Sequence, residues 1–344
     1  MIRISKIFFY LTVALLLLWQ LPWFYAFFAA QKQKPTFTLY STVLGEFITM
    51  GDLKGEGVNR YDEVGNKYTQ EQVDSLLPLF YMRQLITDGR FPDSLRGVAL
   101  VPRDVQQAGF TFRCNASDIN SVKIPLYPLL ESMSGRVDLV MPDDMFRVTK
   151  EGIEFIDMET NTVDEQKSRL FTTAMRNKGF KFPARQLAGN PTARKEYDEG
   201  YLVLDRDGKL FHLKMTCGRP YVRPIPLPEG MEVKHLFITE FRDRKTLGYL
   251  CTTDGRLHVL NNKTYDVIES GIPRYNPESD ALSIYGDLFN WTVCVKNAEG
   301  SHYYALDAND YSLIRSLHFP NQGGNGTRGL HFTSSRDKYV YPRF

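Results

Sequence analysis

Three aspartates form the densest group of acidic residues outside the repeated part of the chain: Asp138, Asp143 and Asp144. Two carboxylates buried side by side can act as general acid and general base. The run 141–144 is also read, more simply, as a turn or a helix cap, because Pro and Asp favour both. We keep these three residues as the only site candidates and assign no catalytic, cofactor-binding or metal-binding residue.

The six histidines all lie after residue 211, so a metal site is the first function to test. His212, His258 and His302 fall in repeated segments, at different distances from the end of the strand that carries each. Because side chains alternate between the two faces of a strand, these histidines are expected to face different ways. Ordinary strand histidines are therefore the preferred interpretation.

The segment Asp205-Arg206-Asp207-Gly208 resembles half of a calcium-binding loop. A complete loop needs an acidic residue at its twelfth position, where this chain has Thr216. A hairpin turn is the simpler interpretation. The chain also has no Gly-x-Ser-x-Gly elbow, no phosphate-binding loop and no His-Glu-x-x-His motif.

The four cysteines, Cys114, Cys217, Cys251 and Cys294, stand singly. Outside the cytoplasm they could form two disulfides in any of three connectivities. Small buried hydrophobic residues are the other interpretation, and the sequence leaves both open.

The overall composition excludes two classes of protein. Lys and Arg number 42 and Asp and Glu number 40, which is far from the excess of basic residues typical of a nucleic-acid binder. Hydrophobic residues make up 43% of the chain and aromatic residues 13%, so the chain is not intrinsically disordered. We expect a folded protein with no nucleic-acid partner.

Residues 7–30, Ile7 to Ala30, carry no charge and are long enough to cross a bilayer as one helix. A cleaved signal peptide and a buried soluble helix are the alternatives, but the run is longer than a usual signal sequence. Arg3, Lys6 and the α-amino group precede it, against Lys32 and Lys34 after it, which weakly favours a cytoplasmic N-terminus. We expect a cytoplasmic tail (1–6), a single-pass anchor in the inner (cytoplasmic) membrane, and a periplasmic domain over 31–344.

A unit of about 45 residues recurs in the last part of the chain. Asp207-Gly208, Asp254-Gly255 and Glu299-Gly300 each separate two apolar runs, as Gly does in a tight hairpin turn. Glu151-Gly152 fits the same frame, and Gly65 and Gly109 extend the spacing more weakly. We expect strong repeats over 147–320, less certain structure over 35–146, and the hairpins of successive units in successive sheets.

A second mark follows the hairpins and resembles the repeat of quinoprotein-like β-propellers. Asn161, Tyr265 and Tyr311 stand where that repeat has Gly, so the resemblance implies a propeller blade and no quinone cofactor. Helices interrupt the pattern near 70–88, behind a capping box at Thr69, and over 164–178. Residues 181–199 are expected to form a loop and 321–329 a flexible tail, and 330–341 is expected to add a strand that closes the ring.

Three further segments resemble a Bacteroidetes family catalogued as domain of unknown function 4857. They are the apolar start, residues 129–144 (beginning Leu-Leu-Glu-Ser) and residues 195–201 (Lys-Glu-Tyr-Asp-Glu-Gly-Tyr). The resemblance implies an anchored envelope protein, encoded near ABC-transporter genes, and brings no catalytic residues with it.

The sequence therefore predicts a mainly β protein with a few helices, an incomplete or about six-bladed propeller behind one transmembrane helix. The function that we expect is binding or accessory, without catalysis and without a cofactor. The lipid bilayer and a membrane protein such as a transporter permease would be its partners. The alternative is an anchored enzyme that acts on an envelope polymer or a small molecule in the propeller channel. Converging carboxylates would favour the enzyme, and a channel blocked by aromatic residues the binding protein.

Overall fold

The computed structural model describes residues 2–29, 36–51, 58–133, 135, 138–320, 331–332 and 342–343. The helices are α1 (Ile2–Ala29), α2 (Gln70–Leu76), α3 (Met82–Thr87), α4 (Pro102–Ala108), α5 (Ala116–Asn120) and α6 (Glu165–Asn177). The strands before residue 200 are β1 (Phe37–Ser41), β2 (Glu46–Gly51), β3 (Asn59–Tyr61), β4 (Ser94–Leu95), β5 (Val98–Ala99), β6 (Phe110–Cys114), β7 (Asp144–Val148), β8 (Ile153–Asp157), β9 (Val163–Asp164) and β10 (Gln186–Gly189). Those after it are β11 (Tyr201–Leu204), β12 (Leu210–Thr216), β13 (Arg219–Ile225), β14 (Val233–Ile238), β15 (Thr246–Thr252), β16 (Leu257–Asn261), β17 (Val267–Glu269), β18 (Ala281–Gly286), β19 (Asn290–Lys296), β20 (Gly300–Asp307), β21 (Leu313–Pro320), β22 (His331–Phe332) and β23 (Pro342–Arg343).

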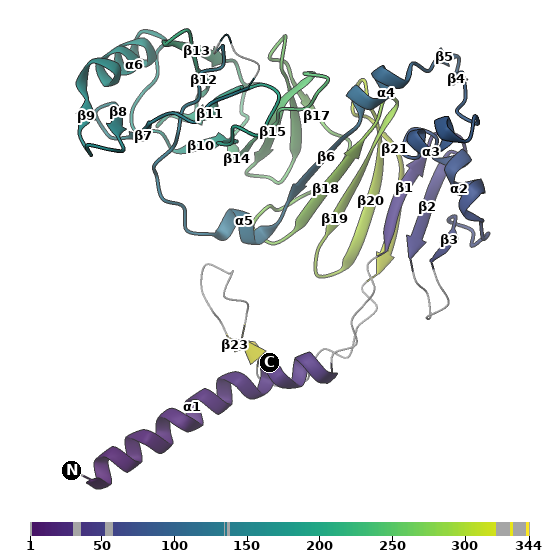
Figure 1. Cartoon of the computed structure of the whole chain (residues 1–344), viewed down its shortest axis with the longest axis horizontal. Coiled ribbons are helices and arrows are strands. Elements are labelled where there is room, and N and C mark those ends of the chain that lie inside the picture. The colour runs from purple at the N-terminus through teal and green to yellow at the C-terminus, as the bar shows by residue number, and fades with distance from the viewer. Residues whose placement is uncertain are drawn as a thin grey trace.

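Helix α1 is long and apolar, as the sequence predicts. Its segment Arg3–Leu21 has the length and composition of a membrane span, and none of it is buried within the molecule. Figure 1 shows α1 lying apart from the larger sheets and beside the short β22–β23 pair. The helix already begins at Ile2, so the expected tail of residues 1–6 is largely helical. A single apolar helix at this position is consistent with a single-pass anchor or with a signal peptide.

The described strands form seven antiparallel sheets, of which the five with three or more strands follow one another in space. Buried clusters join the β7–β9 sheet to the β10–β13 sheet, the β10–β13 sheet to the β14–β17 sheet, and the β14–β17 sheet to the β18–β21 sheet. A further cluster joins the β18–β21 sheet to the β1–β3 sheet. Within the described residues no buried cluster joins the two end sheets, so the sheets form an open arc, which Figure 1 shows from β9 on the left to β3 on the right. The fold is therefore propeller-like and incomplete.

The hairpins predicted at the repeated glycines are present. Gly208 and Gly255, with φ angles of 84° and 83°, lie in the turns before β12 and β16, and Gly300, with a φ of 148°, begins β20 directly after its turn. All three residues in the place of the propeller glycine are left-handed as well: Asn161, Tyr265 and Tyr311 have φ angles of 54°, 64° and 61°. Both tyrosine side chains are buried, Tyr265 against the β10–β13 sheet and Tyr311 against the β14–β17 sheet. The side chain of each tyrosine thus connects its own sheet to the preceding one.

Helix α6 takes the place of a longer outer strand in the β7–β9 sheet. The side-chain hydroxyl of Ser168 accepts a hydrogen bond from Phe155 N, and that of Thr172 accepts one from Ile153 N. A Cβ atom at Gly152 would lie 2.5 Å from Thr172 Oγ1, so this close approach requires glycine. Asp164 caps the helix and Gly179 follows it with a positive φ, as the sequence predicts.

Four expectations differ from the structure. Gly109 ends α4 instead of turning a hairpin, and the following strand β6 joins the distant β18–β21 sheet, so a unit at Gly109 is wrong. The helix expected near 70–88 is two short helices, α2 and α3, which Pro78 separates because Pro cannot continue a helix. The loop expected over 181–199 contains β10. The strand expected to close the ring instead pairs residues 331–332 with 342–343, and the rest of 321–344 lies outside the described residues.

Candidate functional site

The three aspartates singled out by their density in the sequence lie near β7 without forming a pair. Asp138 and Asp143 are exposed, and Asp144 begins β7, where its carboxylate accepts a hydrogen bond from Lys167 Nζ at 2.5 Å. Among the residues that the structure describes, no group of three or more His, Cys, Asp or Glu side chains could hold a metal ion.

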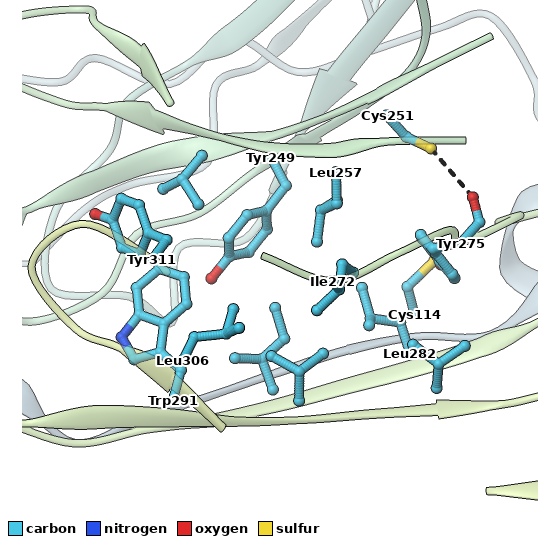
Figure 2. Close-up of a cluster of buried hydrophobic side chains, with 14 residues drawn as sticks. Cys114, Tyr249, Cys251, Leu257, Ile272, Tyr275, Leu282, Trp291, Leu306 and Tyr311 are labelled. Carbon is cyan, nitrogen blue, oxygen red and sulfur yellow. Dashed lines mark hydrogen bonds between the residues drawn. The ribbon is translucent and has the colours of Figure 1, made fainter. Parts of the chain in front are cut away.

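All four cysteines are free thiols, and all but Cys217 are buried. Figure 2 shows Cys114 and Cys251 in the cluster between the β14–β17 and β18–β21 sheets, where the Cys251 thiol donates to the carbonyl oxygen of Tyr275. Burial raises the pKa of Cys251 to about 12, which makes this thiol a poor nucleophile. The hydrophobic interpretation of the cysteines therefore holds for Cys114, Cys251 and Cys294.

Strand β6 fills the inner side of the arc. The first strands β10 and β14 of neighbouring sheets contact each other, so the first strands lie innermost, and β6 pairs with the inner edge of β18. Phe110 of β6 stacks on Phe241 with ring centroids 4.1 Å apart. Phe112 of β6 contacts Phe237 and Tyr249 of the next sheet. Strand β6 is thus an added strand on the inner side of the arc, and its aromatic side chains pack into the cluster between two neighbouring sheets.

A buried ion cluster lies where the loop before β11 meets the β14–β15 loop. Lys195 Nζ is 2.6 Å from Asp198 Oδ1 and 2.6 Å from Glu240 Oε1, and it also donates to the carbonyl oxygen of Asn190. These three contacts use all three N–H bonds of the ammonium group. The Lys195 side chain is only 6% exposed, and those of Asp198 and Glu240 are 2% exposed. Burial raises the pKa of Glu240, and its hydrogen bond from Lys195 opposes that shift.

The same loop connects to a second buried network around His212. The Nε2 atom of His212 lies 2.6 Å from the carbonyl oxygen of Glu199, which can only accept, so Nε2 carries the proton. Nδ1 then accepts from the Tyr265 hydroxyl at 2.8 Å. Burial lowers the pKa of His212 to about 4, so the imidazole is neutral at physiological pH. Lys214 donates to the Glu199 carboxylate and completes the network.

The two networks bring together segments that the family resemblance picked out separately. Ser132, from the segment 129–144, donates to Asp198 Oδ2 at 2.7 Å. Glu131 accepts from the backbone N–H groups of Cys217 and Gly218 in the β12–β13 turn. Because every charged group has a partner, the arrangement braces neighbouring sheets and offers no free acid or base. Sequence reasoning did not connect these residues, although the density of polar residues in 195–201 was a usable signal.

A cavity of about 330 Å³ opens between the β1–β3 sheet, the β18–β21 sheet and the segment after α2. Its walls are mostly apolar, and Asp287 is the only charged residue among those that line it. Sequence analysis did not single out Asp287, which resembles any other turn aspartate in its local context.

An apolar stripe remains at the β7–β9 end of the arc. Met145 pairs with Ile156 and Ile156 with Val163 across the three strands, on the face opposite Phe146 and Phe155. Met158, directly after β8, and Met141, three residues before β7, are exposed, as is Val163. We call these residues, Met141, Met145, Ile156, Met158 and Val163, the apolar stripe.

Three solved structures are similar to this chain. They are the β-propeller domain of Cps50 (Swd1) from Myceliophteria thermophila (11% identity, TM-score 0.30, 58% of this chain and 57% of that one), the Dos1 propeller (12%, 0.28, 52% and 45%) and the WD40 domain of SCAP from fission yeast (10%, 0.33, 91% and 80%). The chain spans about half the length of the first two. No curated protein matches it.

The family described as a domain of unknown function, DUF4857, matches residues 37–306, which include all five sheets up to β20. This match runs through both the segment 129–144 and the segment 195–201 that meet in the buried networks. The chain belongs to the DUF4857 family.

Proposed function

We propose that the protein is a membrane-anchored accessory protein whose propeller-like domain lies in the periplasm and binds a membrane-protein partner such as a transporter permease. In this proposal α1 is an uncleaved anchor in the inner membrane. The bases at Arg3 and Lys6 favour a cytoplasmic N-terminus.

The observation that carries the binding role is the filled inner side of the arc. Propeller enzymes need an open axial site where reactive groups converge, and here the added strand β6 lies on the inner side of the arc, with Phe110 and Phe112 packed against the neighbouring sheet. This supports a rigid scaffold that uses its outer surface over an enzyme that works in a channel.

The apolar stripe is the surface that we propose for the partner. The three middle sheets of the arc have a neighbouring sheet on each side. The β1–β3 sheet, at the other end, has α2 packed against its outer face. The β7–β9 sheet leaves Met158 51% exposed and Val163 37% exposed. An apolar surface rimmed by charged residues such as Arg147 and Glu154 is typical of a protein interface.

Capture from detergent-solubilised membranes tests this proposal. The full-length tagged chain should enrich one membrane protein over a control that carries residues 1–35 alone. The double variant Met158→Glu and Val163→Glu should lose that protein. Val64→Glu, at an apolar residue of the β1–β3 end that is even more exposed, should retain it. Equal capture by all three versions of the full chain would refute the stripe as the interface, and equal capture by residues 1–35 would refute the domain's role.

A further inference from the structure

The cavity beside β18 has the features of a small-molecule site. Its volume of about 330 Å³ lies within the range of protein ligand pockets. It is formed by elements that are far apart in the sequence: β1, the segment between α2 and α3, the start of β6 and the end of β18. This places it next to the inner side of the arc, beside the aromatic residues of β6.

The cavity walls are apolar on most sides. Leu39, Leu76, Leu79, Phe80, Phe110 and Tyr285 contribute hydrophobic surface. A second hollow of about 400 Å³ along α3 and α4 shares Leu79, Phe80, Val105 and Gly109 with the first. The two hollows therefore adjoin, and together they can take a ligand with an extended apolar part.

The polar part of the cavity carries a negative charge. Asp287 Oδ1 accepts hydrogen bonds from the backbone N–H groups of Phe289 and Asn290, at 2.8 and 2.9 Å. No hydrogen bond to Oδ2 and no ion pair of Asp287 is found among the described residues. The charge of Arg96 acts on this carboxylate, but Arg96 lies exposed on the β4–β5 hairpin and forms no ion pair with it among the described residues. Thr42 and Thr292 line the cavity as well.

These features define the ligand by its charge. A half-buried carboxylate without a cationic partner is costly, and a cation that reaches it offsets that cost. The apolar walls offer few hydrogen bonds, which disfavours a sugar or another ligand rich in hydroxyl groups. We propose that this cavity binds a small organic ammonium ion with an apolar body. The ammonium group lies at Asp287, and the apolar body lies against Phe80, Phe110 and Tyr285.

Isothermal titration calorimetry on the full chain in lipid nanodiscs tests the proposal. The probes are phenethylamine, 2-phenylethanol and 3-phenylpropionate, which share an aromatic body and differ in charge. The wild-type chain should bind phenethylamine at least tenfold more tightly than the alcohol, and the anion should bind least. Empty nanodiscs provide the correction for partition into lipid.

Two variants separate the charge from the shape. Asp287→Asn keeps an acceptor for the turn and should abolish the tenfold preference for the ammonium probe. Thr111→Trp, at an exposed residue of the cavity lining, should weaken binding of all three probes by at least tenfold.

Asp157→Asn is the matched control. Asp157 Oδ1 accepts from two backbone N–H groups in the same kind of turn, but Asp157 does not line the cavity. This variant should keep the wild-type preference. No binding of phenethylamine at millimolar concentration, equal affinity for ammonium and alcohol, or an unchanged preference in Asp287→Asn would overturn the proposal. The capture experiment depends on the apolar stripe, and the calorimetry depends on the cavity. Either result can therefore be negative without affecting the other.

Discussion

Replacing Lys195 by methionine tests the buried ion cluster most directly. Methionine keeps an unbranched apolar side chain, one heavy atom shorter than that of lysine, and removes the ammonium group with its charge and three donors. Asp198 and Glu240 then remain buried without their shared cation. Breaking a buried ion pair in this way costs about 3–5 kcal/mol, since an uncompensated charge stays in a poorly solvated site. For a domain of this size that loss lowers the melting temperature by roughly 10 °C.

The loss of stability in Lys195→Met should depend on pH, because Glu240 can take up a proton. Burial raises the pKa of Glu240, and the hydrogen bond and charge of Lys195 lower it. Removing Lys195 should therefore raise the pKa of Glu240 further. A carboxyl with a raised pKa in the folded state binds a proton before the unfolded chain does. Stability therefore increases as the pH falls from the folded-state pKa towards the ordinary value. The deficit of Lys195→Met should shrink between pH 8 and pH 5.

This deficit is measured by unfolding the full chain in detergent with guanidinium. Tryptophan fluorescence reports the transition, because Trp291 is buried in the β18–β21 sheet and becomes exposed on unfolding. Lys181→Met is the matched control, since Lys181 pairs with Asp207 at the surface and should cost less than about 1 kcal/mol. The triple variant Lys195→Met, Asp198→Asn, Glu240→Gln should recover part of the loss. A deficit equal to that of Lys181→Met, or one that does not change with pH, would refute the reasoning.

Three other predictions follow from the structure and the sequence. Because burial lowers the pKa of His212 to about 4, the neutral imidazole contributes stability above pH 6.5 that is lost as the pH falls towards 4. The loss is about 3 kcal/mol relative to His212→Asn in the same unfolding assay, and equal pH profiles would contradict it. Gly255→Val should cost roughly 1–3 kcal/mol because Gly255 has a φ of 83° and a Cβ would lie 3.3 Å from the Tyr275 carbonyl oxygen. Gly45→Val, with a similar φ and open space around it, should cost less, and equal melting temperatures would argue against the contact. Alkaline phosphatase fused after Lys34 or after Phe344 should be active in the periplasm, whereas a mature N-terminus near Gln31 would show a cleaved signal instead.

The features that the sequence determined by itself are local ones. Gly208 and Gly255 adopt left-handed φ angles because the turn between two apolar runs requires them within a few residues. The capping box of Thr69 and Gln72 and the cap of α6 at Asp164 depend only on groups within one helical turn. Helix α1 follows from the length of its apolar run. In each case the stabilising contact lies close in the chain, so a pattern of residue types is enough.

The tertiary structure decided the features that join distant segments. Strand β6 has the alternating pattern of any strand, and nothing near it indicates that Phe112 pairs with Ile284 of β18. Ser132 and Asp198 meet, and Asp287 comes to line a cavity with Leu39, only once the sheets have stacked. The physical reason is that these contacts arise from the packing of whole sheets, whose order along the arc is set by the summed burial of their faces. That total burial cannot be read from any short stretch of sequence.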